Sequence, residues 1–148
     1  MKLKQLFEVK YGKDINLGFK HLTELPSYLP EKVEGYFYCH NNYLTSLEHC
    51  PSEVGGAFFC AYNHLTSLKD VHKRIRKIGK SFQCYDNPIK SHILGLMLIE
   101  IGGKIETGLG DGKDVDVILN KWKNQGRKGA LGCQRELIEA GYKDLAQL

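Results

Sequence analysis

The sequence predicts an α/β protein in which a solenoid of short parallel β-strands is followed by an α-helical cap at the C-terminal end. Two observations lead to this prediction. Residues 33–47 recur without a gap 21 positions later, as residues 54–68. A third copy, residues 78–89, follows at a spacing of 24. Repeats of this period are typical of stacked units, each of which buries an apolar face against its neighbours.

Each copy contains a Phe and, two positions later, a Cys. Residues two apart in a strand share one face, so these pairs are predicted to point into the core. The pairs are Phe37 and Cys39, Phe58 and Cys60, and Phe82 and Cys84. Asparagine occupies one further position in every copy, at Asn42, Asn63 and Asn87. These side chains are predicted to hydrogen-bond the backbone of adjacent turns, where peptide groups leave the strand ladder.

The chain divides into three predicted parts. Residues 1–13 are expected to form an N-terminal cap, residues 14–90 the solenoid, and residues 91–148 an α-helical region. Within the solenoid, residues 14–17 align as a first strand, 22 positions before residues 36–39. Prolines rule out a regular helix in the segments that return between strands, so these segments are expected to be extended; they are Pro26, Pro30 and Pro51.

The C-terminal part is predicted to be mostly helical. Ser91 is expected to cap a buried helix over residues 92–100, which a Gly-Gly pair ends. A short strand over residues 104–107 and a glycine-rich loop follow. Asp114 is expected to cap a second helix with an apolar stripe, formed by Val115, Ile118, Leu119 and Trp122. A last helix is expected within residues 127–140, with an apolar face formed by Ala130, Cys133, Leu137 and Ala140.

The densest run of charge lies between residues 71 and 80. Val71, Ile75 and Ile78 have the spacing of one helical face, which would turn the basic side chains outward. These basic side chains are Lys73, Arg74, Arg76, Lys77 and Lys80. Such a run fits a solvated surface, and it also fits contact with phosphates or with an acidic protein. The net charge of +4 does not separate these alternatives.

Composition and motifs exclude several classes of protein. The composition, 42% hydrophobic and 26% charged over 148 residues, is typical of a soluble globular protein. No stretch reaches the roughly 18 apolar residues of a transmembrane helix, and the first residues show no signal peptide. The five cysteines lack C-x₂-C spacing, so buried free thiols in a reducing cytoplasm are expected. Since the histidines lack metal-ligand spacing and no catalytic motif occurs, we expect no metal, no cofactor and no enzymatic activity.

Aromatic residues gather on the exposed, concave side of the predicted sheet. If the Phe residues of the repeat face the core, then Tyr38, Phe59 and Gln83 form one outward row across the strands. Exposed aromatics in this number favour a site for a partner, and tyrosine is a common interface anchor. The predicted partner-binding residues are Tyr36, Tyr38, His40, Phe59, Tyr62, Gln83 and Tyr85. The alternative is that the N-terminal cap or the C-terminal helices fold back over these rings.

The pattern Phe-x-Cys-x-x-Asn-x-Leu-x-x-Leu resembles the leucine-rich repeat, with Phe and Cys in the first two leucine positions. The copies in residues 36–47 and 58–68 look like those of short leucine-rich-repeat proteins of tailed bacteriophages. Residues 126–142 resemble a tail found at the ends of such phage proteins. The Leu-Thr-Glu-Leu-Pro segment, residues 22–26, is also similar to repeats of secreted bacterial effectors, but no C-x-D ubiquitin-ligase motif follows the repeats.

This resemblance implies a repeat scaffold used for binding, without catalytic residues. We therefore expect a phage-encoded protein-binding module that acts in the host cytoplasm on a host or phage protein, for example by inhibiting a host defence or metabolic factor. The alternative is an RNA- or DNA-binding protein that uses the basic segment, residues 72–80, together with aromatic residues that stack on bases. Salt distinguishes the two, because binding to nucleic acid weakens steeply as the salt concentration rises.

Overall fold

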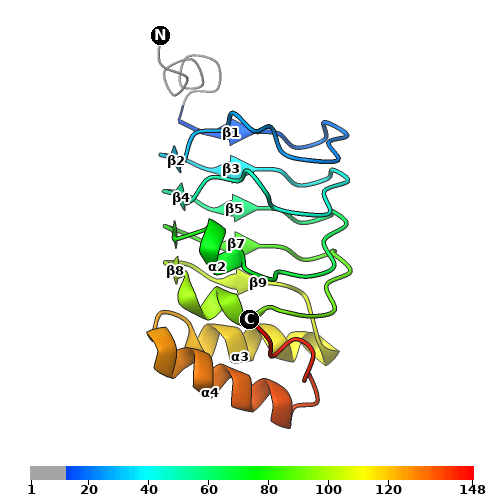
Figure 1. Ribbon diagram of the computed structural model, residues 1–148, viewed down its shortest axis with the longest axis vertical. Helices are drawn as coiled ribbons and strands as arrows, with labels where there is room; N and C mark the ends of the chain where they lie inside the picture. Colours follow the sequence, from blue (N-terminus) through cyan, green and yellow to red (C-terminus); the bar gives the residue numbers. More distant parts are fainter. Residues whose placement is uncertain (1–12) are drawn as a thin grey trace.

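The computed structural model describes residues 13–148 as a β-solenoid with helices at its C-terminal end (Figure 1). Within this range the strands form two parallel sheets, and each strand pairs with the strand of the next turn. Sheet A contains β1 (Ile15–Asn16), β3 (Phe37–Tyr38), β5 (Phe58–Phe59), β7 (Phe82–Gln83) and β9 (Ile105–Glu106). Sheet B contains β2 (Lys32–Val33), β4 (Glu53–Val54), β6 (Lys77–Ile78) and β8 (Glu100–Ile101). The predicted α/β class and the solenoid of parallel strands are therefore confirmed.

The strand register follows the repeat in the sequence. In sheet A, Phe37 pairs with Ile15 on one side and with Phe58 on the other. Phe58 pairs in turn with Phe82, and Phe82 pairs with Ile105. The residues of this row are therefore 22, 21, 24 and 23 positions apart along the chain. The first three of these spacings are those that the sequence predicted.

The Phe and Cys pairs of the repeat point inward, as predicted. Phe37, Phe58 and Phe82 are 0% exposed, and the centroids of successive rings lie 5.0 and 5.5 Å apart. The cysteines of the same turns are equally buried: Cys39, Cys60 and Cys84. Sheet B contributes an aliphatic row to the same core, formed by Val33, Val54, Ile78 and Ile101. The two sheets therefore share one hydrophobic core along the length of the solenoid.

A ladder of buried asparagines joins successive turns. The Nδ2 of Asn63 donates to the carbonyl oxygens of Cys39 and Cys60, at 2.9 and 3.1 Å, and its Oδ1 accepts from the amide of Leu44 at 3.0 Å. Asn42 and Asn87 make the equivalent bonds one turn before and one turn after. These side chains pair backbone groups at a bend where no strand is available to do so, which confirms their predicted structural role.

The returning segments are extended, as the prolines predicted, but they also pair as sheet B, which the sequence analysis did not anticipate. Successive turns approach closely on this side. A Cβ atom on Gly55 would lie 2.2 Å from the carbonyl oxygen of Glu34, and one on Gly79 would lie 2.0 Å from that of Gly55. Glycine is needed at these positions because any side chain would collide with the neighbouring turn.

The helix predicted from the apolar spacing of residues 71–80 is much shorter than expected. Helix α2 (Val71–Arg74) ends where the backbone becomes extended at Ile75, and Ile78 lies in β6. Val71, Ile75 and Ile78 are all buried, but they do not share one helical face. Because β6 pairs with both β4 and β8, the sheet register overrides the local helical pattern.

The solenoid also continues beyond residue 90, where the sequence analysis ended it. The predicted helix over residues 92–100 is wrong: a 3₁₀ helix, η1 (Leu94–Leu98), is followed directly by β8. Ser91 does not cap η1, whose N-cap position is Ile93. The predicted strand over residues 104–107 is present as β9. β8 and β9 extend both sheets in register, with Ile105 in place of the inward Phe.

Helices η2 (Asp111–Lys113), α3 (Asp114–Trp122) and α4 (Gly126–Glu139) follow at the C-terminal end of the solenoid (Figure 1). α3 and α4 correspond to the two helices expected there. Asp114 is the first residue of α3 and not its cap, and its carboxylate accepts a hydrogen bond from the hydroxyl of Tyr142 at 2.9 Å. The predicted apolar residues of α3 and α4 are buried or half-buried, except for Ala140, which is exposed. α4 packs closely on Trp122, since a Cβ atom on Gly132 would lie 2.6 Å from that ring.

One polar face of α3 pairs with the last strands of the solenoid. Asn120 accepts from the amide of Ile105 at 2.9 Å and donates to its carbonyl oxygen at 2.8 Å. Asn124 pairs with Ile101 in the same way, at 2.9 and 2.7 Å. Asp116 accepts from two backbone amides just after β9, at 2.8 and 3.0 Å. Asp116 and Asn120 are four residues apart on α3, and Asn124 lies just after its end, so α3 and the residues that follow it take the place of the next strand.

Most of the predicted N-terminal cap, residues 1–12 of 1–13, lies outside the described residues. In the part of the chain that the structure describes, no helix is long and apolar enough to cross a membrane. All five cysteines of the sequence are free thiols.

Candidate functional site

The candidate site is the outer surface of sheet A. The register sets Tyr38 beside Phe59 and Phe59 beside Gln83, so the predicted row across the strands is present. Apart from Tyr62, which is exposed, the predicted site residues are half-buried; these are Tyr36, Tyr38, His40, Phe59, Gln83 and Tyr85. The residues two positions before and after Phe59 are the small residues Ala57 and Ala61, and both are buried. The ring of Phe59 is therefore flanked by small side chains.

Three rings stack at the centre of this surface. The centroids of Tyr38 and Phe59 lie 4.9 Å apart, and their planes differ by 4°. Tyr36 lies 5.9 Å from Tyr38 and 6.2 Å from Phe59, with interplanar angles of 16° and 12°. We call Tyr36, Tyr38 and Phe59 the aromatic stack. Contact between Tyr38 and Phe59, expected from the sequence, is confirmed.

Lys80 contacts the aromatic stack, although its sequence position grouped it with the basic segment. Its ammonium group donates to the hydroxyl of Tyr36 at 2.7 Å and lies 5.0 Å from the centroid of the Tyr36 ring. The hydrogen bond to Tyr36 raises the pKa of Lys80. The aromatic stack therefore carries one positive charge at its edge, in a position that also permits a cation–π contact.

His40 extends the aromatic surface toward one corner of the solenoid. Its ring meets Tyr38 and Phe19 edge-on, at centroid distances of 5.9 and 5.3 Å. It also lies against Gly18, where a Cβ atom would come within 2.7 Å of the imidazole. Burial lowers the pKa of His40, and its Nδ1 has no hydrogen-bond partner among the described residues. His40 therefore packs as a ring between its aromatic neighbours.

Tyr62 and Tyr85 form a second aromatic pair on the same side. Their rings meet edge-on with centroids 5.6 Å apart. The neighbouring carboxylate of Asp86 raises the pKa of Tyr62, first through its charge and then through a hydrogen bond. Gln83 pairs with Phe59 in the strand register and is two residues before Tyr85, so it connects this pair with the aromatic stack.

The C-terminal helices leave the aromatic stack uncovered. α3 and α4 lie beyond β9 at the end of the solenoid, away from β3 and β5 (Figure 1). The alternative in which these helices fold back over the rings is therefore wrong, because Asn120 of α3 and Asn124 just after it hold this region across the last strands. The other alternative, a cover by the N-terminal cap, concerns residues that lie, apart from Lys13, outside the described part of the chain.

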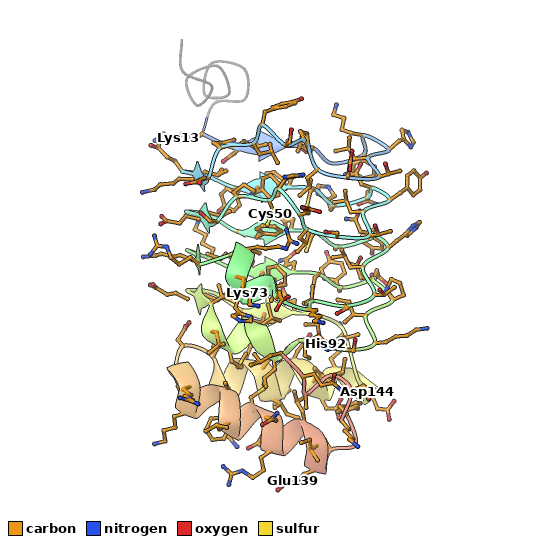
Figure 2. All side chains as sticks on the ribbon, in the orientation of Figure 1. Lys13, Cys50, Lys73, His92, Glu139 and Asp144 are labelled. Carbon is orange, nitrogen blue, oxygen red and sulfur yellow. The ribbon has the colours of Figure 1, made fainter. Side chains whose placement is uncertain are left out.

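The basic segment is interspersed with acidic partners. Lys73 projects from α2 (Figure 2) and pairs with Asp70 at 3.1 Å. Lys77 pairs with Glu100 at 3.3 Å, and Arg76 forms an ion pair with Glu53. Along sheet B the outward row alternates in charge, with Lys32, Glu53, Lys77 and Glu100 in register. Arg74 is exposed and has no ion pair among the described residues. The predicted patch is thus a mixed-charge surface and not a continuous positive one.

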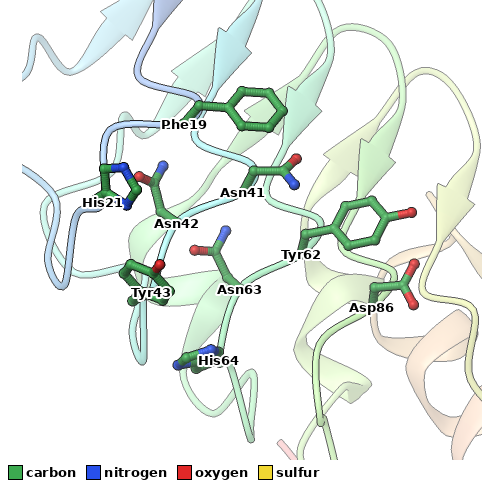
Figure 3. Close-up of a pocket in the computed structure, with 9 residues that line it drawn as sticks. All are labelled: Phe19, His21, Asn41, Asn42, Tyr43, Tyr62, Asn63, His64 and Asp86. Atoms are coloured by element: carbon green, nitrogen blue, oxygen red, sulfur yellow. The ribbon is translucent and has the colours of Figure 1, made fainter.

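A groove at the corner of the solenoid adds residues that sequence reasoning missed. Phe19, His21, Asn41, Tyr43, His64 and Asp86 line it together with Tyr62 (Figure 3). The signal for these residues was present in the repeat: Phe19, Asn41, Tyr62 and Asp86 are spaced by 22, 21 and 24 residues, as the strands are. The repeat therefore includes this corner as well as the strands and the asparagine ladder.

The residue types in the sequence raise two kinds of chemical site, a metal site and a reactive cysteine. The described residues contain no group of three or more His, Cys, Asp and Glu side chains placed to hold a metal ion. Cys133 is 0% exposed, and burial, with a smaller contribution from Glu136, raises the pKa of its thiol to about 12. A thiol with such a pKa is not an activated nucleophile at neutral pH.

Comparison with known proteins gives no match: no family model, no curated protein and no solved structure is similar to this chain.

Proposed function

We propose that this protein is a binding module whose aromatic stack docks a protein partner. The observation that supports this most directly is the parallel stacking of Tyr36, Tyr38 and Phe59 on a sheet face that the C-terminal helices leave uncovered (Figure 1). These rings lie outside the core, since Phe37 and Phe58 fill the other side of the same strands. The solenoid fold therefore does not need them, whereas a partner would gain a rigid apolar surface.

The surroundings of the stack match the anatomy of a protein interface. Energetic hot spots consist of a few central aromatic or Arg residues within a ring of less important contacts. Here the small residues Ala57, Ala61 and Ser81 lie around Phe59, and Lys80 supplies a polar edge. Truncating a central aromatic of this kind typically costs about 2 kcal/mol or more of binding free energy.

The charged surface of sheet B is less suited to binding. Its basic residues already have acidic partners in the same sheet, and exposed pairs of this kind contribute little free energy. A nucleic-acid partner would need unpaired cations to replace the counterions of its phosphates. Within the basic segment, residues 72–80, the alternative function therefore rests on Arg74, Lys80 and the stacking ability of the rings.

The resemblance of the repeats to leucine-rich-repeat proteins of tailed bacteriophages extends the proposal. In this view the protein is phage-encoded and acts in the host cytoplasm, on a host or phage protein such as a defence or metabolic factor. The free cysteines fit a reducing compartment of this kind. In this function the protein acts by binding to its partner and not by catalysis.

The test is affinity capture from a bacterial lysate with two matched double variants. Tyr38→Ala/Phe59→Ala is expected to keep the melting temperature within a few degrees and to lose the captured protein. Lys73→Ser/Arg74→Ser removes exposed charge beside sheet B and is expected to retain it. Capture by the unaltered protein is expected to survive nuclease and to change little between low and moderate salt. If the serine variant loses its partner, or nuclease abolishes capture, the nucleic-acid function replaces this proposal.

A further inference from the structure

The corner groove is a second surface, distinct from the aromatic stack. It has a volume of about 470 Å³ and runs along the corner where each turn leaves sheet A (Figure 3). One wall is a row of equivalent residues from successive turns, which we call the corner row: Phe19, Asn41, Tyr62 and Asp86. The other wall is formed by His21, Tyr43 and His64.

The backbone at the corner row adopts a left-handed conformation in every turn. The φ angles are 57° at Phe19, 55° at Asn41, 54° at Tyr62 and 53° at Asp86. Asn and Asp tolerate this conformation, because their short side chains bond locally to the backbone. A bulky aromatic side chain does not, and it is rare there unless the surrounding structure enforces it. The repeat therefore favours Asn or Asp at this position, yet aromatic residues occupy two of these four sites.

Burial of the rings does not explain why aromatic residues occupy these two left-handed positions. Phe19 is 68% exposed and Tyr62 is 49% exposed, so both rings remain largely in water. Phe19 makes one edge-on ring contact, with His40, and Tyr62 makes one with Tyr85 and a hydrogen bond with the Asp86 carboxylate. An unfavourable backbone conformation combined with an exposed apolar ring is the kind of outlier from which a functional role is inferred.

The opposite wall is also built from exposed rings. Tyr43 stacks on His21 with centroids 5.9 Å apart and lies 5.5 Å from His64. Tyr43 is 46% exposed. His21 adopts a positive φ of 56° as well. The groove is therefore bordered along the solenoid axis by ring faces and edges on both sides.

The polar groups in the groove favour an uncharged ligand with many hydroxyl groups. No Lys or Arg lines it, and Asp86 is its one carboxylate among the described residues. The amides of Asn42 and Asn63 are occupied by the backbone ladder, but the side chain of Asn41 has no hydrogen bond within the described part of the chain. A phosphate or sulfate would meet the Asp86 charge without a cation to balance it.

The separation of the rings points to an extended ligand. Phe19 and Tyr62 belong to turns that are two strand spacings apart, or about 9.6 Å. A single ammonium group midway between them would lie about 4.8 Å from each ring, within the roughly 6 Å of a cation–π contact, so a cationic ligand is the rival that the titration below must separate. The distance also suits a chain whose successive units present flat C–H faces to Phe19 and Tyr62.

We propose that the corner groove binds a neutral oligosaccharide that lies along the solenoid axis. Pyranose rings offer apolar C–H faces that pack on Phe19 and Tyr62, while their hydroxyls reach the amide of Asn41 and the carboxylate of Asp86. This site is independent of the aromatic stack and adds a ligand class to the proposed protein-binding function.

The test is an NMR titration of the ¹⁵N-labelled full-length protein with three neutral hexasaccharides: β-1,4-linked glucose, α-1,4-linked glucose and β-1,4-linked N-acetylglucosamine. At least one is expected to shift the amide signals of residues 19–21, 41–43 and 62–64. The key variant is Phe19→Asn/Tyr62→Asn, because asparagine is the natural residue at the equivalent position 41. This variant is expected to raise the dissociation constant at least tenfold. Its melting temperature is expected to stay the same or to rise. Tyr28→Ser, which removes an exposed ring outside the groove, serves as the control and is expected to bind normally.

Several outcomes would overturn the proposal. The absence of shifts at the groove with all three sugars would do so, as would unchanged binding by the asparagine variant. A clear fall in the melting temperature of that variant would show that the rings support the fold and would remove the premise. Shifts with tetramethylammonium but with none of the sugars would assign the groove to cationic ligands.

Discussion

Single side chains at repeated positions hold the turns of this solenoid together. Asn63 bridges two turns by pairing the backbone of Cys39 and Leu44 in one turn with that of Cys60 in its own. It is 3% exposed, so water cannot substitute for these bonds. His64, its neighbour, points out into the corner groove and is exposed. Asn63 and His64 are adjacent and both polar, but only Asn63 is expected to matter for stability.

Replacing Asn63 by Ala is therefore expected to destabilise the protein far more than replacing His64. Loss of the side chain leaves buried backbone groups without partners, at about 1–3 kcal/mol each. We expect Asn63→Ala to lower the free energy of unfolding by roughly 2–4 kcal/mol. His64→Ala should change it by no more than about 0.5 kcal/mol. Urea unfolding of both variants measures the difference, and equal midpoints would contradict the ladder.

At the scale of elements, α3 caps the C-terminal end of the solenoid. The last strands would otherwise expose unpaired N–H and C=O groups, which template aggregation. α3 covers them with apolar side chains, Val115 and Leu119, and they pair with the amide side chains of Asn120 on α3 and of Asn124 just after it. The helix therefore buries the core and continues the hydrogen-bonding pattern with one surface.

The role of α3 can be tested with two substitutions on the same helix. Asn120→Ala removes both bonds to the backbone of Ile105 and is expected to cost about 1–3 kcal/mol of unfolding free energy. Val117→Ala lies on the outer side, where Val117 is 71% exposed, and is expected to change stability by no more than about 0.5 kcal/mol. Thermal unfolding of the two variants gives the comparison. A cost at position 117 equal to that at position 120 would rule out the strand-like role of α3.

At the scale of the whole molecule, the protein is a linear stack with different surfaces on its sides. Sheet A presents aromatic rings, sheet B presents alternating charges, and the corner between sheet A and the returning segments carries the groove. In such a stack each turn contacts only its neighbours, so stability depends on position along the axis. Inner turns are held from both sides, whereas β1 has a strand partner on one side only among residues 13–148.

This architecture predicts a gradient of amide hydrogen exchange. The amide of Cys60 donates to Gln83 at 2.8 Å in the middle of sheet A, and the amide of Ile15 donates to Tyr36 at 2.9 Å in the first described turn. Although the bonds are similar in length, Cys60 is expected to exchange about tenfold more slowly or more, because it opens only when inner turns separate. Exchange followed by NMR measures this, and equal rates would indicate that all turns open together.

The sequence alone determined the parts of the fold that repeat. The period, the inward Phe and Cys, the role of Asn63 and the contact of Tyr38 with Phe59 follow from aligning equivalent positions, because stacked parallel strands bring equal positions together. Where the repeat degenerates, local patterns predict the wrong element. The apolar run before β8 predicts a helix, since a short buried run has no periodicity that separates strand from helix.

Only the tertiary structure decided which partners the charged residues contact, how the C-terminal end of the solenoid is covered, and how the corner row is oriented. Lys80 meets Tyr36, and Arg76 meets Glu53, across separations of more than 20 residues that no local pattern encodes. The pairing of Asn120 with β9 depends on where α3 lies across the last turn. The left-handed backbone that turns Phe19 and Tyr62 outward is imposed by the stacking of the turns against the intrinsic preference of both residues. Equivalent positions can be read from a repeat, but contacts between unlike positions exist only once the chain is folded.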